Sequence, residues 1–160
     1  MTPSIARTQL TADYSIPKII NGGWQLATGH ALAHALDMKD AHNAFAELLD
    51  RGFDTFDCAD IYTGVEAFYG QIIAERRRAG LSLPQIHTKF VPDLKDLAHV
   101  DRAYVERVIE RSLSRLGVER LDMVQFHWWD YDVPGMIDTA GELMRLQDCL
   151  LYTSPRPRDM

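Results

Sequence analysis

The sequence has little cysteine and no long apolar run. Its 160 residues include two cysteines, Cys58 and Cys149, with neither the CxxC spacing of a redox motif nor the density of a disulfide framework. No apolar stretch approaches the roughly 18 residues of a membrane span. The first residues also lack the apolar segment of a signal peptide. These absences favour a cytoplasmic protein without a membrane partner.

An excess of basic residues is also missing. The chain carries 17 Lys and Arg against 23 Asp and Glu, for a formal net charge of −6. Binding to the phosphates of nucleic acid requires a basic face, and anionic lipid surfaces attract polybasic segments. We therefore expect neither nucleic acid nor a membrane surface as a partner.

Short β-rich runs alternate with longer helical ones along the chain. Asp37 is a candidate N-cap, and Gly52, Gly80 and Gly117 follow the first three helical runs. The predicted strands are 16–20, 53–59, 85–91 and 121–129. The predicted helices are 37–50, 65–79, 101–116 and 134–147. This order implies an α/β fold with a parallel sheet and right-handed crossovers.

Two parallel architectures fit this order, an open doubly wound sheet and a (β/α) barrel. A dinucleotide-binding Rossmann sheet carries G-x-G-x-x-G after its first strand, because the phosphates approach the backbone there. Asn21-Gly22-Gly23 follows the first predicted strand here, which is too short a match. The sequence therefore favours the barrel.

Ionisable side chains of several kinds lie at the carboxyl ends of the predicted strands, where barrel enzymes carry their chemistry. The second strand offers Asp57 near its end, with Asp60 and Tyr62 just beyond the strand, the third offers Lys89, and the fourth offers His127. A tyrosine hydroxyl is a poor proton donor near neutral pH unless a nearby cation stabilises its anion. Lys89 would supply that cation, and Asp57 would hold Lys89 in place. Tyr62 is therefore a candidate general acid, and His127 a candidate donor to a carbonyl oxygen.

Four segments resemble the aldo-keto reductase family. Gly52–Tyr62 is similar to its signature around the catalytic Asp and Tyr, Thr88–Phe90 to the strand with the catalytic Lys, and Leu116–Trp128 to the segment that ends in the catalytic His. Gly22-Gly23-Trp24 resembles the turn after the first strand. The resemblance extends in order from about Ile16 to Gln147.

This resemblance implies an oxidoreductase on a (β/α)8 TIM barrel, of which the chain supplies the first four βα units. NADP(H), with NAD(H) as the alternative, would deliver hydride to the carbonyl carbon of a small aldehyde or ketone. Tyr62 would protonate the alkoxide, Lys89 and Asp57 would tune Tyr62, and His127 would position the substrate oxygen. No metal is implied.

The resemblance also implies two sets of binding residues. The cofactor-binding candidates are Gly22, Gly23, Trp24 and Asp57. The substrate-pocket candidates are Trp24, Trp128 and Trp129.

The length of the chain bears on activity, since a complete (β/α)8 barrel takes about 250 residues. We expect residues 1–148 to form the N-terminal half of such a barrel and residues 149–160, which contain two prolines and no strand alternation, to be a non-native tail. Half a barrel would be inactive by itself. Its unpaired strand edges would favour self-association.

Two other functions stay open at this stage. The chain could be a non-catalytic binding subunit on the same scaffold. It could also be a metal-dependent barrel hydrolase with Asp57, Asp60 and His127 as ligands, although this leaves Tyr62 and Lys89 without a role. The other histidines, which lack ligand spacing, are His30, His34, His42, His87 and His99.

Overall fold

The computed structural model describes residues 5–28 and 37–152, the last four of them by their backbone alone. The strands are β1 (Arg7–Thr11), β2 (Tyr14–Pro17), β3 (Asn21–Gly22), β4 (Thr55–Asp57), β5 (Gln85–Phe90) and β6 (Met123–Phe126). The helices are α1 (Met38–Asp50), α2 (Val65–Arg78), α3 (Arg102–Leu116) and α4 (Met136–Tyr152), with short 3-10 helices at Trp24–Leu26 and Leu94–His99. Most of the predicted tail, from residue 153 onward, lies outside the described residues.

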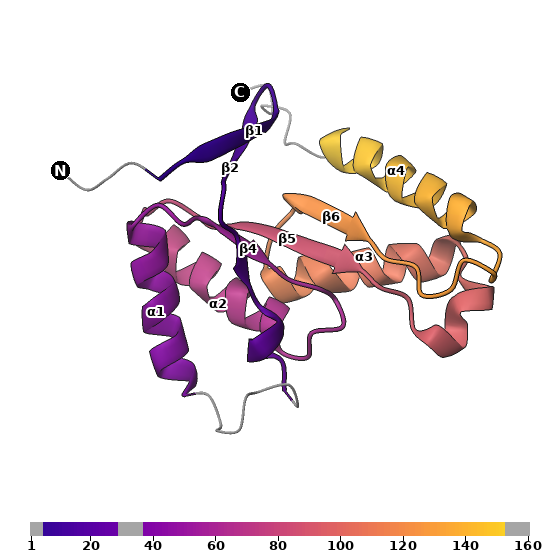
Figure 1. Ribbon diagram of the computed structural model, residues 1–160, viewed down its shortest axis with the longest axis horizontal. Coiled ribbons are helices and arrows are strands. Elements are labelled where there is room, and N and C mark those ends of the chain that lie inside the picture. The colour runs from indigo at the N-terminus through magenta and orange to yellow at the C-terminus, as the bar shows by residue number, and fades with distance from the viewer. Residues whose placement is uncertain (1–4, 29–36, 153–160) are drawn as a thin grey trace, which may run out of the picture.

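A parallel sheet of four strands carries the fold, in the order β3-β4-β5-β6 (Figure 1). Each strand lies beside the next one in the sequence. A doubly wound sheet reverses its strand order near the middle, whereas a barrel wall keeps sequence order. The structure is thus the first four βα units of a (β/α) barrel, and the predicted fold class is confirmed.

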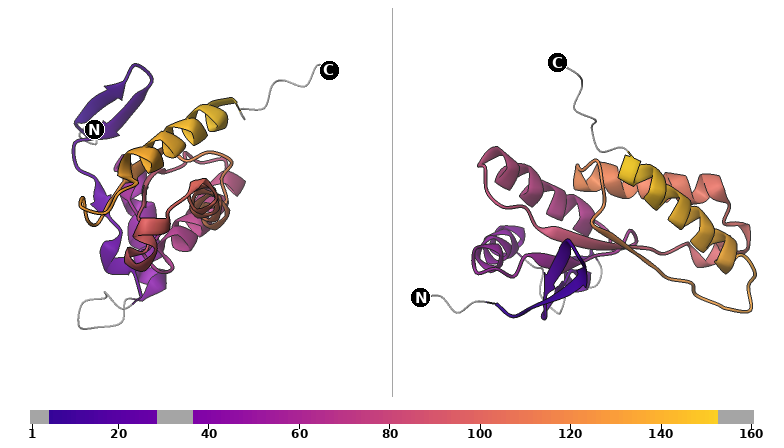
Figure 2. Two further views of the ribbon diagram at one scale, coloured as in Figure 1. Left: turned by 90° about the vertical axis from the view of Figure 1, so that its right-hand side faces the viewer. Right: turned by 90° about the horizontal axis from the view of Figure 1, so that it is seen from above.

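The first predicted strand, 16–20, was wrong. Ile16 and Pro17 instead end β2, which pairs antiparallel with β1, and Lys18 to Ile20 are exposed linker residues. The parallel strand is Asn21–Gly22, paired with Phe56 and Asp57 of β4. Asn and Gly are weak strand formers, so the pairing with β4 overrides their local preference. The β1–β2 hairpin extends away from α1, α2 and α3 (Figure 2, left).

The helix boundaries follow their capping residues. Asp37 accepts hydrogen bonds from the N–H groups of Lys39 and Asp40, as its predicted capping role requires. Gly117 ends α3 with a φ of 65°, a left-handed conformation that suits glycine. The first three helices therefore lie within one residue of their predictions, whereas α4 extends beyond residue 147 to Tyr152.

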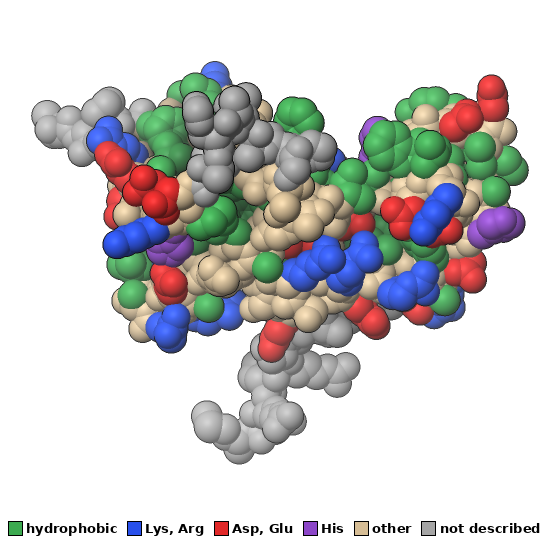
Figure 3. Space-filling model, turned by 90° about the horizontal axis from the view of Figure 1, so that it is seen from below, with side chains coloured by type: hydrophobic (Ala, Val, Ile, Leu, Met, Phe, Trp, Pro, Cys, Tyr) green, Lys and Arg blue, Asp and Glu red, His purple; other side chains and the backbone are tan. Residues whose placement is uncertain are grey.

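All four helices pack on one face of the sheet, called here the outer face, through two hydrophobic clusters. Beneath α1 and α2, the rings of Phe45, Phe56, Phe68 and Tyr69 pack with centroids 4.8–5.7 Å apart. A second cluster joins Phe90 of β5 to α3. The surface of the helical layer carries basic and acidic side chains side by side (Figure 3). The opposite, inner face of the sheet carries the candidate site.

Among the helices described in residues 5–28 and 37–152, none is long and apolar enough to cross a membrane.

Close packing of α2 on α3 depends on Gly70. A Cβ atom at this position would overlap the carbonyl oxygen of Arg115 and lie 3.2 Å from backbone atoms of Leu116. We expect Gly70→Ala to lower the free energy of unfolding by about 1–3 kcal/mol, because the helices must separate. Gly141→Ala is the matched control on α4, where nothing lies within 4 Å of the new Cβ. Gly141→Ala should raise the free energy of unfolding by about 0.5–1 kcal/mol, because alanine favours the helix more than glycine does. Urea unfolding measures both, and equal effects would contradict this account.

Candidate active site

The inner face of the sheet brings polar side chains together where the strands end. Asp57 is the last residue of β4, Lys89 the penultimate residue of β5, and His127 directly follows β6. Lys89 is paired in register with Gln125 of β6. The structure therefore places these residues at one rim, as expected from the sequence.

The ammonium of Lys89 is held by oxygen atoms of β4. Its Nζ lies 2.6 Å from Asp57 Oδ1 and donates to the carbonyl oxygen of Cys58 at 2.8 Å. Gln125 Nε2 donates to the same Asp57 oxygen at 3.1 Å. Lysine is rarely buried without a partner, and here the Lys89 side chain is only 20% exposed. The ion pair thus fixes a cation at the rim of the sheet.

Tyr62 lies beside that cation. Its backbone N–H donates to the carbonyl oxygen of Ala59 in the tight turn that follows β4. The Nζ of Lys89 lies 5.2 Å from the centroid of the Tyr62 ring, within the range of a cation–π contact. Direct contacts therefore connect three of the four candidate catalytic residues, Asp57, Tyr62 and Lys89.

His127 is placed at the same rim by the backbone. Its N–H donates to the carbonyl oxygen of Phe90, the residue after Lys89. The exposed imidazole meets the Trp129 ring edge to face at a centroid distance of 4.5 Å. Trp129 Nε1 in turn donates to the carbonyl oxygen of Pro92 at 2.7 Å. His127 thus shares this end of the sheet with Trp129.

The three tryptophans of the predicted pocket are not on one side. Trp24 and Trp129 are 48% and 47% exposed at the rim. Trp128 is 4% exposed; its Nε1 donates to the carbonyl oxygen of Val133, and its ring packs on Phe126. Successive side chains of an extended segment point to opposite faces. Trp128 therefore lies on the outer face, away from His127, and departs from the expected pocket.

The two candidate glycines differ in their surroundings. Gly23 donates its N–H to the carbonyl oxygen of Asp57, and a Cβ there would lie 2.7 Å from that oxygen and 2.7 Å from the hydroxyl of Tyr69. Glycine is thus required at this position by packing. At Gly22, nothing lies within 4 Å of a Cβ position. The open space beside Gly22 would let a flat ring approach the backbone.

The two carboxylates proposed as metal ligands in the alternative function are both engaged in other contacts. Asp57 is paired with Lys89, whereas Asp60 accepts hydrogen bonds from the Val91 N–H and from Arg111. Within the part of the chain that the structure describes, no three His, Cys, Asp or Glu residues are grouped to hold a metal ion. His30 and His34 lie outside the described residues.

Burial controls the ionisation of groups around the site. It raises the pKa of the Cys58 thiol to about 12 and that of Asp60 to about 6, because both charged forms lose hydration. It lowers the pKa of His87, whose Nε2 lies 2.9 Å from the hydroxyl of Tyr14. Cys58 is thus a protonated packing residue, and His87 favours the neutral form.

Two residues take part in the hydrogen bonds of the site although the sequence alone does not indicate this. Gln125 belongs to the fourth predicted strand and to the Leu116–Trp128 segment, but the sequence suggests no role for its side chain, because its contact with Asp57 depends on the register of β5 and β6. Asp60 lies just beyond the second predicted strand, and the only role that the sequence suggests for it is that of a metal ligand, whereas its partners in the structure are Arg111 of α3 and Val91, the residue after β5. Both residues are identified only by contacts between segments that lie far apart in the sequence.

Comparison with known proteins identifies the family to which this chain is similar. Residues 18–149 match the sequence model of the Aldo/keto reductase family. Aldo-keto reductase YhdN of Bacillus subtilis (strain 168) is 30% identical over 147 residues, which cover 89% of this chain and 41% of YhdN. The chain thus spans less than half the length of this curated relative.

Solved structures agree on the fold. An aldo-keto reductase from Bacillus halodurans, in its holo form, has a TM-score of 0.69 at 23% identity, over 91% of this chain and 47% of that one. One from Bombyx mori, in complex with NADP, has a TM-score of 0.69 at 21% identity, over 92% of this chain and 48% of that one. With the family match over most of its length, the chain belongs to the aldo/keto reductase family.

Proposed function

We propose that the protein containing this chain is an NADP(H)-dependent oxidoreductase that reduces an aldehyde or ketone to an alcohol, with Tyr62 as the general acid. The observation that carries the proposal is the position of the Lys89 ammonium, paired with Asp57 at 2.6 Å and 5.2 Å from the ring centroid of Tyr62. A cation at this place stabilises the phenolate that remains after proton transfer. Membership of the family supports the same chemistry.

Each residue has a distinct role in this proposal. Asp57 keeps Lys89 charged and fixed, Lys89 stabilises the anion of Tyr62, and Tyr62 gives its proton to the developing alkoxide. His127 donates to the carbonyl oxygen and orients it. When bound, NADPH supplies the hydride. The open space beside Gly22 and the exposed ring of Trp24 suit a flat nicotinamide at this rim.

Carbonyl-dependent oxidation of NADPH by the intact gene product tests the proposal. Loss of NADPH absorbance should require an added aldehyde or ketone and should yield the alcohol, with NADH assayed in parallel. The 160-residue chain alone should show no turnover, since it spans 41% of YhdN. Tight binding of NADPH without turnover on any carbonyl would instead favour the non-catalytic binding subunit.

We also propose that this chain by itself associates through its sheet edges. Within the described residues, β3 and β6 are the outer strands of the parallel sheet. Their unpaired N–H and C=O groups favour pairing with another chain. Sedimentation that finds only monomer across a range of concentrations would contradict this.

A further inference from the structure

Asp60 fastens the loop that follows β4 to the strand that carries Lys89. Its N–H donates to the carbonyl oxygen of Lys89 at 3.1 Å, and its Oδ1 accepts the N–H of Val91 at 2.9 Å. These two bonds lie on either side of Phe90, so the end of β5 is fixed at two points. Because Tyr62 lies two residues after Asp60, the same bonds set the distance between Tyr62 and Lys89.

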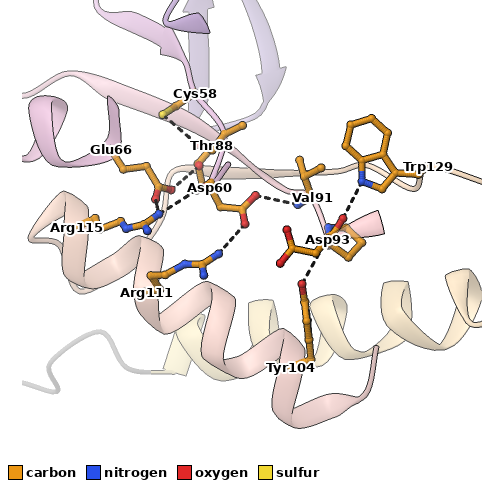
Figure 4. Close-up of polar contacts among 12 residues, drawn as sticks. Cys58, Asp60, Glu66, Thr88, Val91, Asp93, Tyr104, Arg111, Arg115 and Trp129 are labelled. Carbon is orange, nitrogen blue, oxygen red and sulfur yellow. Dashed lines mark hydrogen bonds and ion pairs between the residues drawn. The ribbon is translucent and has the colours of Figure 1, made fainter. Parts of the chain in front are cut away.

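Two arginines of α3 hold Asp60 from the outer face (Figure 4). Arg111 Nη2 lies 3.0 Å from Asp60 Oδ2, and Arg115 Nη1 donates to the carbonyl oxygen of Asp60 at 2.9 Å. Arg115 also reaches Glu66 of α2 at 3.2 Å, and Glu66 accepts a hydrogen bond from Thr88 Oγ1 at 2.8 Å. The network therefore connects α2, α3 and β5 around the Tyr62 loop.

A contribution to folding stability does not by itself explain this network of buried carboxylates and arginines. The side chains of Asp60 and Glu66 are each 1% exposed, and burying two carboxylates costs hydration energy that ion pairs only partly return. The raised pKa of Asp60 reflects that cost. Well-packed apolar residues often stabilise such positions equally well. Directed contacts, in contrast, fix one geometry.

We infer that Asp60 is the positioning residue of the proposed active site, which sets Tyr62 against Lys89 and is itself held by Arg111 and Arg115. The inference rests on the proposed function for its catalytic consequence. Its structural part, the fixing of the Tyr62 loop on β5, can be measured without turnover.

Hydrogen exchange on this chain tests the structural part. Asp60→Asn keeps the oxygen that faces Val91 and loses the charge that faces Arg111, whereas Asp60→Ala loses both. The hydrogen-bonded amides of Asp60 or its replacement, Tyr62 and Val91 should exchange about tenfold faster in the first variant and about a hundredfold faster in the second. Arg102→Ala is the matched control, since it breaks an exposed ion pair with Glu106 on the same helix. Unchanged exchange in both Asp60 variants would overturn the inference.

Kinetics of the intact gene product tests the catalytic part. Asp60→Asn should lower kcat by about tenfold to a hundredfold, because a shift of about 1 Å in a reacting group has effects of this size. KM for NADPH should not change. Arg111→Ala should behave alike, and Arg111→Lys should recover part of the loss. A loss of folded protein alone would lower activity only in proportion to the unfolded fraction, which the melting temperature of each variant reveals, and would leave kcat per folded molecule unchanged.

The pH profile separates positioning from folding. Asp60 faces Arg111 and Arg115 of α3 and Glu66 of α2. Below pH about 6 the carboxyl gains a proton and no longer attracts Arg111 as an anion. The advantage in kcat of the natural protein over Asp60→Asn should therefore be full well above the pKa of about 6, decline as the pH falls through that value, and be lost well below it. A constant ratio would overturn the positioning role.

The two hypotheses fail in different ways. An intact gene product that reduces no carbonyl would refute the proposed function, and exchange of the Tyr62 loop would still decide whether Asp60 fixes it. Full reductase activity in Asp60→Asn, with a loosened loop, would refute the positioning role and leave the proposed function in place.

Discussion

Replacing Tyr62 by phenylalanine should lower kcat of the intact gene product by about 10²–10⁴-fold, the usual contribution of a positioned general acid. The substitution removes one hydroxyl and keeps the ring beside Lys89, whose Nζ lies 5.2 Å from its centroid. Packing of the half-buried ring against the core is also kept. Rates of carbonyl reduction at saturating NADPH and substrate measure the effect.

A matched substitution controls for the loss of any tyrosine hydroxyl. Tyr131 lies between β6 and α4, is 79% exposed, and has no part in the proposed site. Tyr131→Phe should leave kcat unchanged. NADPH affinity should be the same in both variants, because the Tyr62 hydroxyl is proposed to act on the substrate oxygen. A Tyr62→Phe enzyme within a few-fold of the natural rate would refute Tyr62 as the general acid.

The sequence predicted the helices better than the strands, for a physical reason. Helix ends are set by local contacts, such as the Asp37 cap and the left-handed conformation of Gly117. Single residues in the sequence indicate these contacts. A strand exists only by pairing with another segment. The short β3, Asn21–Gly22, is a strand because β4 lies beside it, and no local preference of these residues shows this.

The candidate site was predictable where residue type and strand position coincide. Asp57 and Lys89 could be paired in advance because they are opposite charges near the ends of adjacent strands. Trp128 was misplaced because its side depends on alternation continuing past the end of β6. The link between Asp60 and Arg111 joins residues 51 positions apart, which only the packing of α3 on the sheet creates.

Replacing Lys89 by methionine should lower kcat by about 10²–10³-fold, the range seen when one preorganised electrostatic group is removed from an active site. Methionine fills similar space without the charge, so the phenolate of Tyr62 loses its stabilising cation. Asp57 then loses its 2.6 Å partner and keeps the hydrogen bond from Gln125 at 3.1 Å. Lys95→Met, at an exposed position in the 3-10 helix Leu94–His99, is the control and should have no effect.

A double substitution tests whether Asp57 acts through Lys89. If Asp57 only holds and charges Lys89, then Asp57→Asn should cost less than Lys89→Met, and the two together should cost no more than Lys89→Met alone. Residues that act as a unit are non-additive in this way. Circular dichroism would establish that each variant is folded. If the losses in kcat of the two single variants instead multiply in the double variant, then Asp57 contributes separately from Lys89. Asp57 is also a cofactor-binding candidate, so a direct contact with the cofactor would account for that separate contribution.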